Sequence, residues 1–127
     1  THKQRASQAK RVAMSTEEFI QRMEKKARDA IHQQFQHPVE DDQVLLFLQH
    51  HIEEIEAEYW LKHTAQAQPT PAQVLQILVL NPYMEWELEE NEESYMIDFT
   101  LPDDATQYML CVQFDRDEKL IGISMES

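Results

Sequence analysis

The C-terminal end of the chain reads YMIDFTLPDDATQYMLCVQFDRDEKLIGISMES (residues 95–127) and decides the fold. Apolar residues occupy every second position of residues 95–101, 108–114 and 121–125. This period of two places them on one face of a strand. Acidic turns separate the three segments. The pattern therefore predicts three antiparallel strands that share an apolar face, which helices are free to cover.

A further strand is predicted upstream of these three. Its apolar and acidic residues alternate in the order Met84, Glu85, Trp86, Glu87 and Leu88. The strand can extend back to Ile77, with a break at Asn81 and Pro82, because proline interrupts a ladder of hydrogen bonds. The C-terminal half therefore predicts a four-stranded antiparallel meander.

The N-terminal half of the chain predicts helices. Ser15 stands three residues before Glu18, which is the spacing of a capping box at a helix start. Apolar residues then recur at helical spacing as far as Phe35. The helix is expected to end at His37, because the residue before a proline is pushed out of the helical region.

Two more helices are expected before the sheet. The second begins at Asp41 or Asp42, either of which suits an N-cap, and continues to Lys62. Its predicted apolar stripe contains Val44, Leu45, Leu48, Ile52, Ile55 and Tyr59. A short third helix is predicted over residues 71–75, because a Thr-Pro pair places a capping residue before a proline at the first helical position.

These elements indicate an α+β fold in one domain. Two N-terminal helices and the short third helix are expected to pack on one face of the four-stranded meander. The domain is predicted to cover residues 14–127, and residues 1–13 are predicted to form a basic arm before it.

Charge is distributed unevenly along the chain. The first 39 residues hold eight Lys and Arg against four acids, whereas residues 40–127 hold three against 20. The two parts carry +4 and −17, which gives the net charge of −13. An excess this one-sided costs self-repulsion, so it is either tolerated or used to meet something positive.

The composition excludes several classes of function. Gly122 is the only glycine, so the glycine-rich loops of nucleotide-binding enzymes and the nucleophile elbow of hydrolases cannot be built. Cys111 is the only cysteine and is expected to be a passive thiol on the polar-facing side of its strand. A lone cysteine favours a reducing compartment, so a cytoplasmic location is predicted. No apolar run approaches a membrane span, and no membrane partner is expected.

The C-terminal sequence resembles a bacterial family of small acidic proteins filed as a domain of unknown function. The resemblance rests on Asp98-Phe99-Thr100, Asp103-Asp104, Phe114-Asp115, Met125-Glu126-Ser127 and the segment LQHHIEEI at residues 48–55. It covers residues 40–127 and departs from the family where Asp117-Glu118 replaces an expected Asp-Gly. The resemblance implies an α+β fold and supplies no catalytic residues.

One cluster has the residue types of a metal site. His50, His51 and Glu54 lie close in sequence, and His50, Glu54 and Glu58 share a helix face at spacings of four residues. A structural zinc site needs four ligands, and no second His/Cys pair completes this one. We therefore predict neither a metal nor another cofactor, and expect His51 to be a boundary residue of its helix.

The densest acidic run is EWELEENEE at residues 85–93. Its acids, together with two on the second helix, are the predicted partner-binding residues: Glu85, Glu87, Glu89, Glu90, Glu92, Glu93, Glu53 and Glu54. The alternative is a solvated hairpin that blocks edge-to-edge pairing of strands by repulsion.

The sequence as a whole predicts a non-enzymatic, acidic protein-binding domain. Toxin-neutralising (immunity) proteins have this profile, so the expected partner is a basic protein such as a nuclease-type toxin. Four charges on the basic arm are too few to predict nucleic-acid binding. Two alternatives stay open: a metal protein or enzyme that uses the cluster of His50, His51 and Glu54, and a homo-oligomer joined through residues 1–13.

Overall fold

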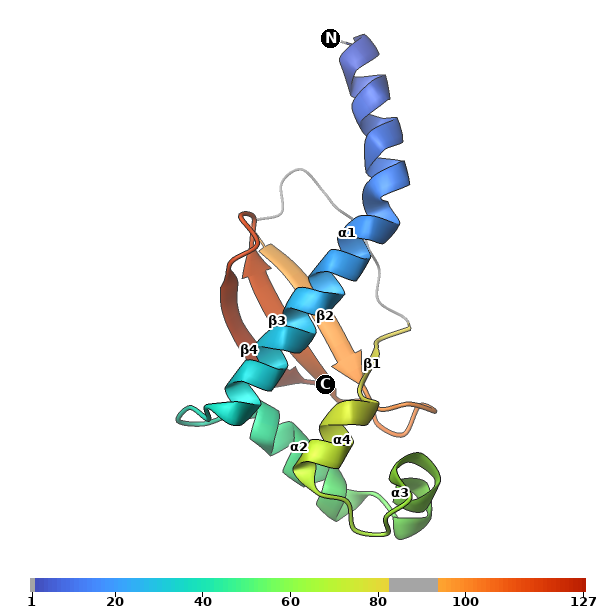
Figure 1. Ribbon diagram of the computed structural model, residues 1–127, viewed down its shortest axis with the longest axis vertical. Coiled ribbons are helices and arrows are strands. Elements are labelled where there is room, and N and C mark those ends of the chain that lie inside the picture. Colours follow the sequence, from blue (N-terminus) through green and yellow to red (C-terminus); the bar gives the residue numbers. More distant parts are fainter. Residues whose placement is uncertain (1, 83–93) are drawn as a thin grey trace.

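The structure is a computed structural model that describes residues 2–82 and 94–127, with side chains from residue 17 onward. The described helices are α1 (His2–Gln36), α2 (Gln43–Glu54), α3 (Ala57–Thr64) and α4 (Pro71–Ile77). The strands are β1 (Val79–Leu80), β2 (Ser94–Thr100), β3 (Met109–Asp115) and β4 (Leu120–Glu126). Helices gather against one sheet, so the α+β class is confirmed (Figure 1).

The four strands form one antiparallel sheet in the order β1-β2-β3-β4, which confirms the predicted meander. Ile97 lies opposite Val112, and Val112 lies opposite Ile123, so all three residues share one face of the sheet. Phe99 and Leu110 form the next pair on that face, and both are fully buried. The predicted apolar face is therefore present on the three C-terminal strands.

The pattern fails at the start of β4. Phe114 pairs with Leu120 and Gln113 pairs with Gly122, so Ile121 is an extra residue in a β-bulge. The bulge removes Ile121 from the core-facing series, and its exposed fraction is 55%. The prediction that Ile121 belongs to the apolar face is therefore wrong.

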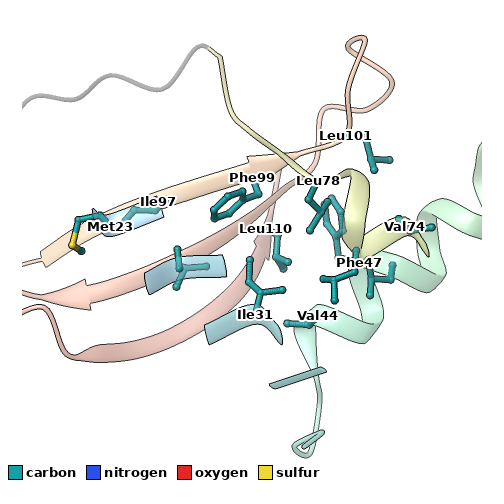
Figure 2. Packing of buried hydrophobic residues seen from close by; sticks show 14 of the residues in the cluster. Met23, Ile31, Val44, Phe47, Val74, Leu78, Ile97, Phe99, Leu101 and Leu110 are labelled. Atoms are coloured by element: carbon teal, nitrogen blue, oxygen red, sulfur yellow. The ribbon is translucent and has the colours of Figure 1, made fainter. Parts of the chain in front are cut away.

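The core lies between this sheet face and the helices. Figure 1 shows α1 crossing the sheet diagonally. Met23, Ala27 and Ile31 follow one another at intervals of four residues on α1 and are buried. Figure 2 shows Phe47 of α2 and Val74 of α4 in the same cluster, close to the end of the sheet where these helices lie.

Helix α1 begins earlier than predicted. Ser15 lies inside α1 and not at its start, so the expected capping box is wrong. The helix includes the arm up to His2, because the arm is rich in Ala, Arg, Lys and Gln and contains neither Gly nor Pro. Figure 1 shows this first part of α1 extending beyond the sheet.

The predicted second helix is divided in two. Ile55 and Glu56 have extended backbones, with ψ of 142° and 151°, and they separate α2 from α3. The break frees the carbonyl of Ile55, which accepts a hydrogen bond of 3.2 Å from the indole N–H of Trp60. Trp60 is thereby buried with its polar atom satisfied, a tertiary contact that sequence periodicity does not reveal.

The short helix before the sheet is confirmed with a small extension. Thr70 and Gln73 form a complete capping box, Pro71 is the first helical residue, and α4 ends at Ile77. Strand β1 follows directly. The further strand that was predicted over residues 84–88 lies outside the described residues.

Candidate protein-binding surface

The predicted acidic contact surface is described only in part. Glu85, Glu87, Glu89, Glu90, Glu92 and Glu93 lie outside the described residues. Glu53 and Glu54 are described, and they are the last two residues of α2. Of the eight predicted contact residues, the structure therefore places only Glu53 and Glu54, at this end of α2.

The acidic residues at the junction of α2 and α3 point to solvent. Glu53, Glu54, Glu56 and Glu58 are all exposed. None of them forms an ion pair with another residue in the part of the chain that the structure describes. The C-terminal end of a helix carries partial negative charge, so Glu53 and Glu54 add like charge to α2 where a cation would be favourable.

The Lys and Arg side chains that the structure describes on α1 and α3 are already paired. The ion pairs are Arg22–Glu118, Lys26–Glu118, Lys25–Asp29, Arg28–Glu24 and Lys62–Asp103. Residues 29–61 contain no Lys or Arg and hold eight acids. The end of α1, the loop after it, all of α2 and the start of α3 (residues 29–61) therefore form one acidic region without Lys or Arg.

A shallow groove lies at the other end of α2. It encloses about 600 Å³ and is lined by Pro38, Val39, Asp41, Asp42, Gln43, Leu45, Leu46 and Gln49. Val39 and Leu46 have exposed fractions of 56% and 50%, which makes them two of the large apolar residues most open to solvent. The sequence prediction missed this feature, although Leu46 already lay outside the predicted apolar stripe.

Asp42 fixes the shape of that groove, because it ties the loop to the start of α2. Its carboxylate accepts hydrogen bonds from the backbone N–H groups of Val39, Val44 and Leu45 and from the side chain of Gln34. Burial acts to raise the pKa of Asp42, but these hydrogen bonds outweigh it and hold the pKa below its usual range. Asp42 is thus the N-cap, as the sequence allowed.

His51 is fully buried, so its prediction as a boundary residue is wrong. Its Nδ1 lies 2.7 Å from the carbonyl oxygen of Phe47, which can only accept, so Nδ1 carries the proton. Its Nε2 lies 2.9 Å from the hydroxyl of Thr106 and accepts from it. Burial lowers the pKa of His51 and outweighs the hydrogen bond to Phe47, which raises it, so the imidazole is neutral at pH 7.

This geometry weakens the metal hypothesis. Both ring nitrogens of His51 are engaged within the protein, so His51 has no lone pair to offer an ion. The ring of His50 packs edge-on against the rings of His51 and Tyr108, with ring centroids 5.1 Å apart in each case. Among the residues that the structure describes, no group of three or more His, Cys, Asp or Glu is arranged to hold a metal ion.

Cys111 lies on the sheet face opposite the helices, as predicted, because it pairs with Asp98 and Ser124 and not with core residues. Its exposed fraction is nevertheless only 3%. Burial, followed by a hydrogen bond to Asp98, raises the pKa of the thiol far above its usual range. The thiol is therefore protonated, which is the unreactive state.

Across the described residues, no helix combines the length and the apolar character needed to cross a membrane. Comparison with known proteins gives no match for this chain among family models, curated proteins or solved structures.

Proposed function

We propose that this chain is a non-enzymatic protein-binding domain whose acidic surface meets a basic protein partner. A toxin-neutralising, immunity-like role fits this description, with a nuclease-type toxin as the partner. One observation carries the proposal: the acidic region of residues 29–61 has no cation of its own, and its exposed acids at the α2–α3 junction have no ion-pair partner among the described residues.

The position of these acids supports a role in binding. Placing Glu53 and Glu54 at the C-terminal end of α2 costs stability, because the helix dipole disfavours negative charge there. A cationic partner would remove this cost and would be steered to the surface by its charge. The arrangement thus favours association over the stability of the free chain.

The first test is affinity capture from the native cell with the full chain as bait, at about 50 mM and about 500 mM salt, since screening weakens such contacts. We expect a basic protein to be retained at low salt and released at high salt. Failure to retain any basic protein at low salt would contradict the proposal.

Charge reversal then locates the contact. Glu53→Lys with Glu54→Lys tests the end of α2, and Lys at Glu89, Glu90, Glu92 and Glu93 tests the predicted hairpin. We expect each set to slow association, with a difference that shrinks as salt rises. Glu17→Lys with Glu18→Lys is the matched control for the end of α2, because these exposed acids lie on α1, outside the acidic region of residues 29–61. Equal binding by all variants would rule out both surfaces.

A further inference from the structure

We propose that the groove between the α1–α2 loop and α2 is the specificity site for the basic partner, where one apolar side chain of that partner docks between Val39 and Leu46. This inference rests on the proposed function and adds the chemistry of the contact. The partner it fits presents an apolar side chain with a Lys or Arg on each side.

The walls of the groove provide the apolar anchor point. Val39 and Leu46 both line it and are about half exposed, and Pro38 and Leu45 complete the apolar lining. Asp42 holds the loop against α2 through its bonds to Val39 and to the start of the helix, so the groove is preformed. A preformed groove avoids the entropy cost of ordering a site on binding.

Acidic side chains flank the anchor point on two sides. Glu40 and Asp41 are exposed in the loop next to Val39. On α2, Leu46 and Glu53 share one face because they are seven residues apart, which is about 10 Å along the helix axis. A cation placed about 10 Å from the apolar side chain therefore reaches the negative end of α2.

Charge favours a foreign partner over a second copy of this chain. In a symmetric dimer the same patch meets itself, so Glu40, Asp41 and Glu53 of one copy would face the same acids of the other. Such like-charge contacts are unfavourable. A basic partner instead neutralises the acids that flank the groove while its apolar side chain displaces water from Val39 and Leu46.

The test uses the full chain and three helical probe peptides of about 18 residues. The first carries one Leu with an Arg about two turns away on each side, the second replaces that Leu by Ala, and the third replaces both Arg by Glu. We expect the Leu/Arg peptide to bind about tenfold or more tightly than the Ala/Arg peptide, and the Leu/Glu peptide to bind weakest. Backbone amide signals of Val39 and Leu46 should shift on binding.

Leu46→Ser removes one wall of the groove, and Ile121→Ser is the control, since Ile121 is equally exposed but lies on β4. We expect Leu46→Ser to abolish the preference for Leu over Ala and Ile121→Ser to keep it. If both Arg peptides bind in a salt-sensitive way and with equal affinity, the groove is not the specificity site, and the proposed function still stands. No binding by any peptide would count against both. A wild-type dimer that Leu46→Ser dissociates would place a second copy in the groove and overturn the proposal.

Discussion

His51 and Glu118 are polar residues at positions where other residue types are favoured. His51 is buried in the core, and Glu118 has a φ of 61°, in the left-handed region that favours glycine. Each is retained by specific partners: His51 by Phe47 and Thr106, and Glu118 by cations on α1. Thr106 is 55 residues from His51, and the α1 cations are more than 90 residues from Glu118, so neither role could be read from local spacing.

Stability should depend on the protonation of His51. Its folded pKa is below the ordinary 6.5, so the unfolded chain binds the proton more readily. The free energy of unfolding should therefore be fully supported above pH 6.5 and fall as the pH drops below that value. His51→Gln should cost about 1–3 kcal/mol at pH 7, because buried partners lose their hydrogen bonds, and should flatten the slope between about pH 7 and pH 5.

Urea unfolding across this pH range measures the effect, with His37→Gln as the exposed control. A wild-type slope that His51→Gln leaves unchanged would show that another group titrates.

Glu118 tests how a turn residue can offset its own backbone strain. Its carboxylate binds the guanidinium of Arg22 through two contacts of 3.0 Å and the amine of Lys26 at 3.3 Å. Glu118→Ala keeps the left-handed φ and loses these contacts, so we expect a loss of about 1 kcal/mol. Glu118→Gly relieves the strain and should be the more stable of the two variants.

The carboxylate of Glu118 should also make the free energy of unfolding depend on pH in the acidic range. The hydrogen bond from Arg22, helped by Lys26 and opposed by burial, holds the pKa of Glu118 below its ordinary 4.5. Its contribution is therefore present above pH 4.5 and is lost as the pH falls through the lower, folded value. Unfolding at pH 7 and near pH 3 should show a smaller difference for both Glu118 variants than for the wild type.

At the scale of elements, the three C-terminal strands and the starts of α2 and α4 could be predicted, whereas the start of α1 and the break between α2 and α3 could not. Alternation along β2 and β3 is a local property of the sequence, and a period of two survives in the structure. The break at Ile55 serves the burial of Trp60 and is decided by tertiary packing. The buried residues of α2 are Val44, Phe47, Leu48 and His51. Counting His51 among the apolar residues of the helical pattern would therefore have identified the buried face.

The end of α2 should show a trade-off between stability and binding. Glu53→Gln with Glu54→Gln removes two negative charges from the C-terminal end of the helix. The free chain should then gain about 0.3–1 kcal/mol per residue in unfolding free energy, while binding of the Leu/Arg peptide weakens. Thermal unfolding and peptide titration of the same samples measure both effects. A variant that loses stability and keeps its affinity would contradict this account of the acidic surface.

At the scale of the whole molecule, the acidic region and the basic arm occupy different places in the fold. The acidic region borders the core through α2, which contributes Val44, Phe47 and Leu48. The first part of α1 extends beyond the sheet in Figure 1. Residues 2–13 belong to this part of α1, which is the element that the homo-oligomer alternative requires.

Removing residues 1–13 separates that alternative from the proposed function. We expect the shortened chain to keep its unfolding free energy within about 0.5 kcal/mol, because the helix it loses extends beyond the sheet in Figure 1. Light scattering at low salt should give the same monomeric mass for both chains, since a foreign basic partner and not a second copy is proposed for the acidic region. A larger mass for the full chain alone would instead show that the basic arm of one copy docks on the acidic body of another.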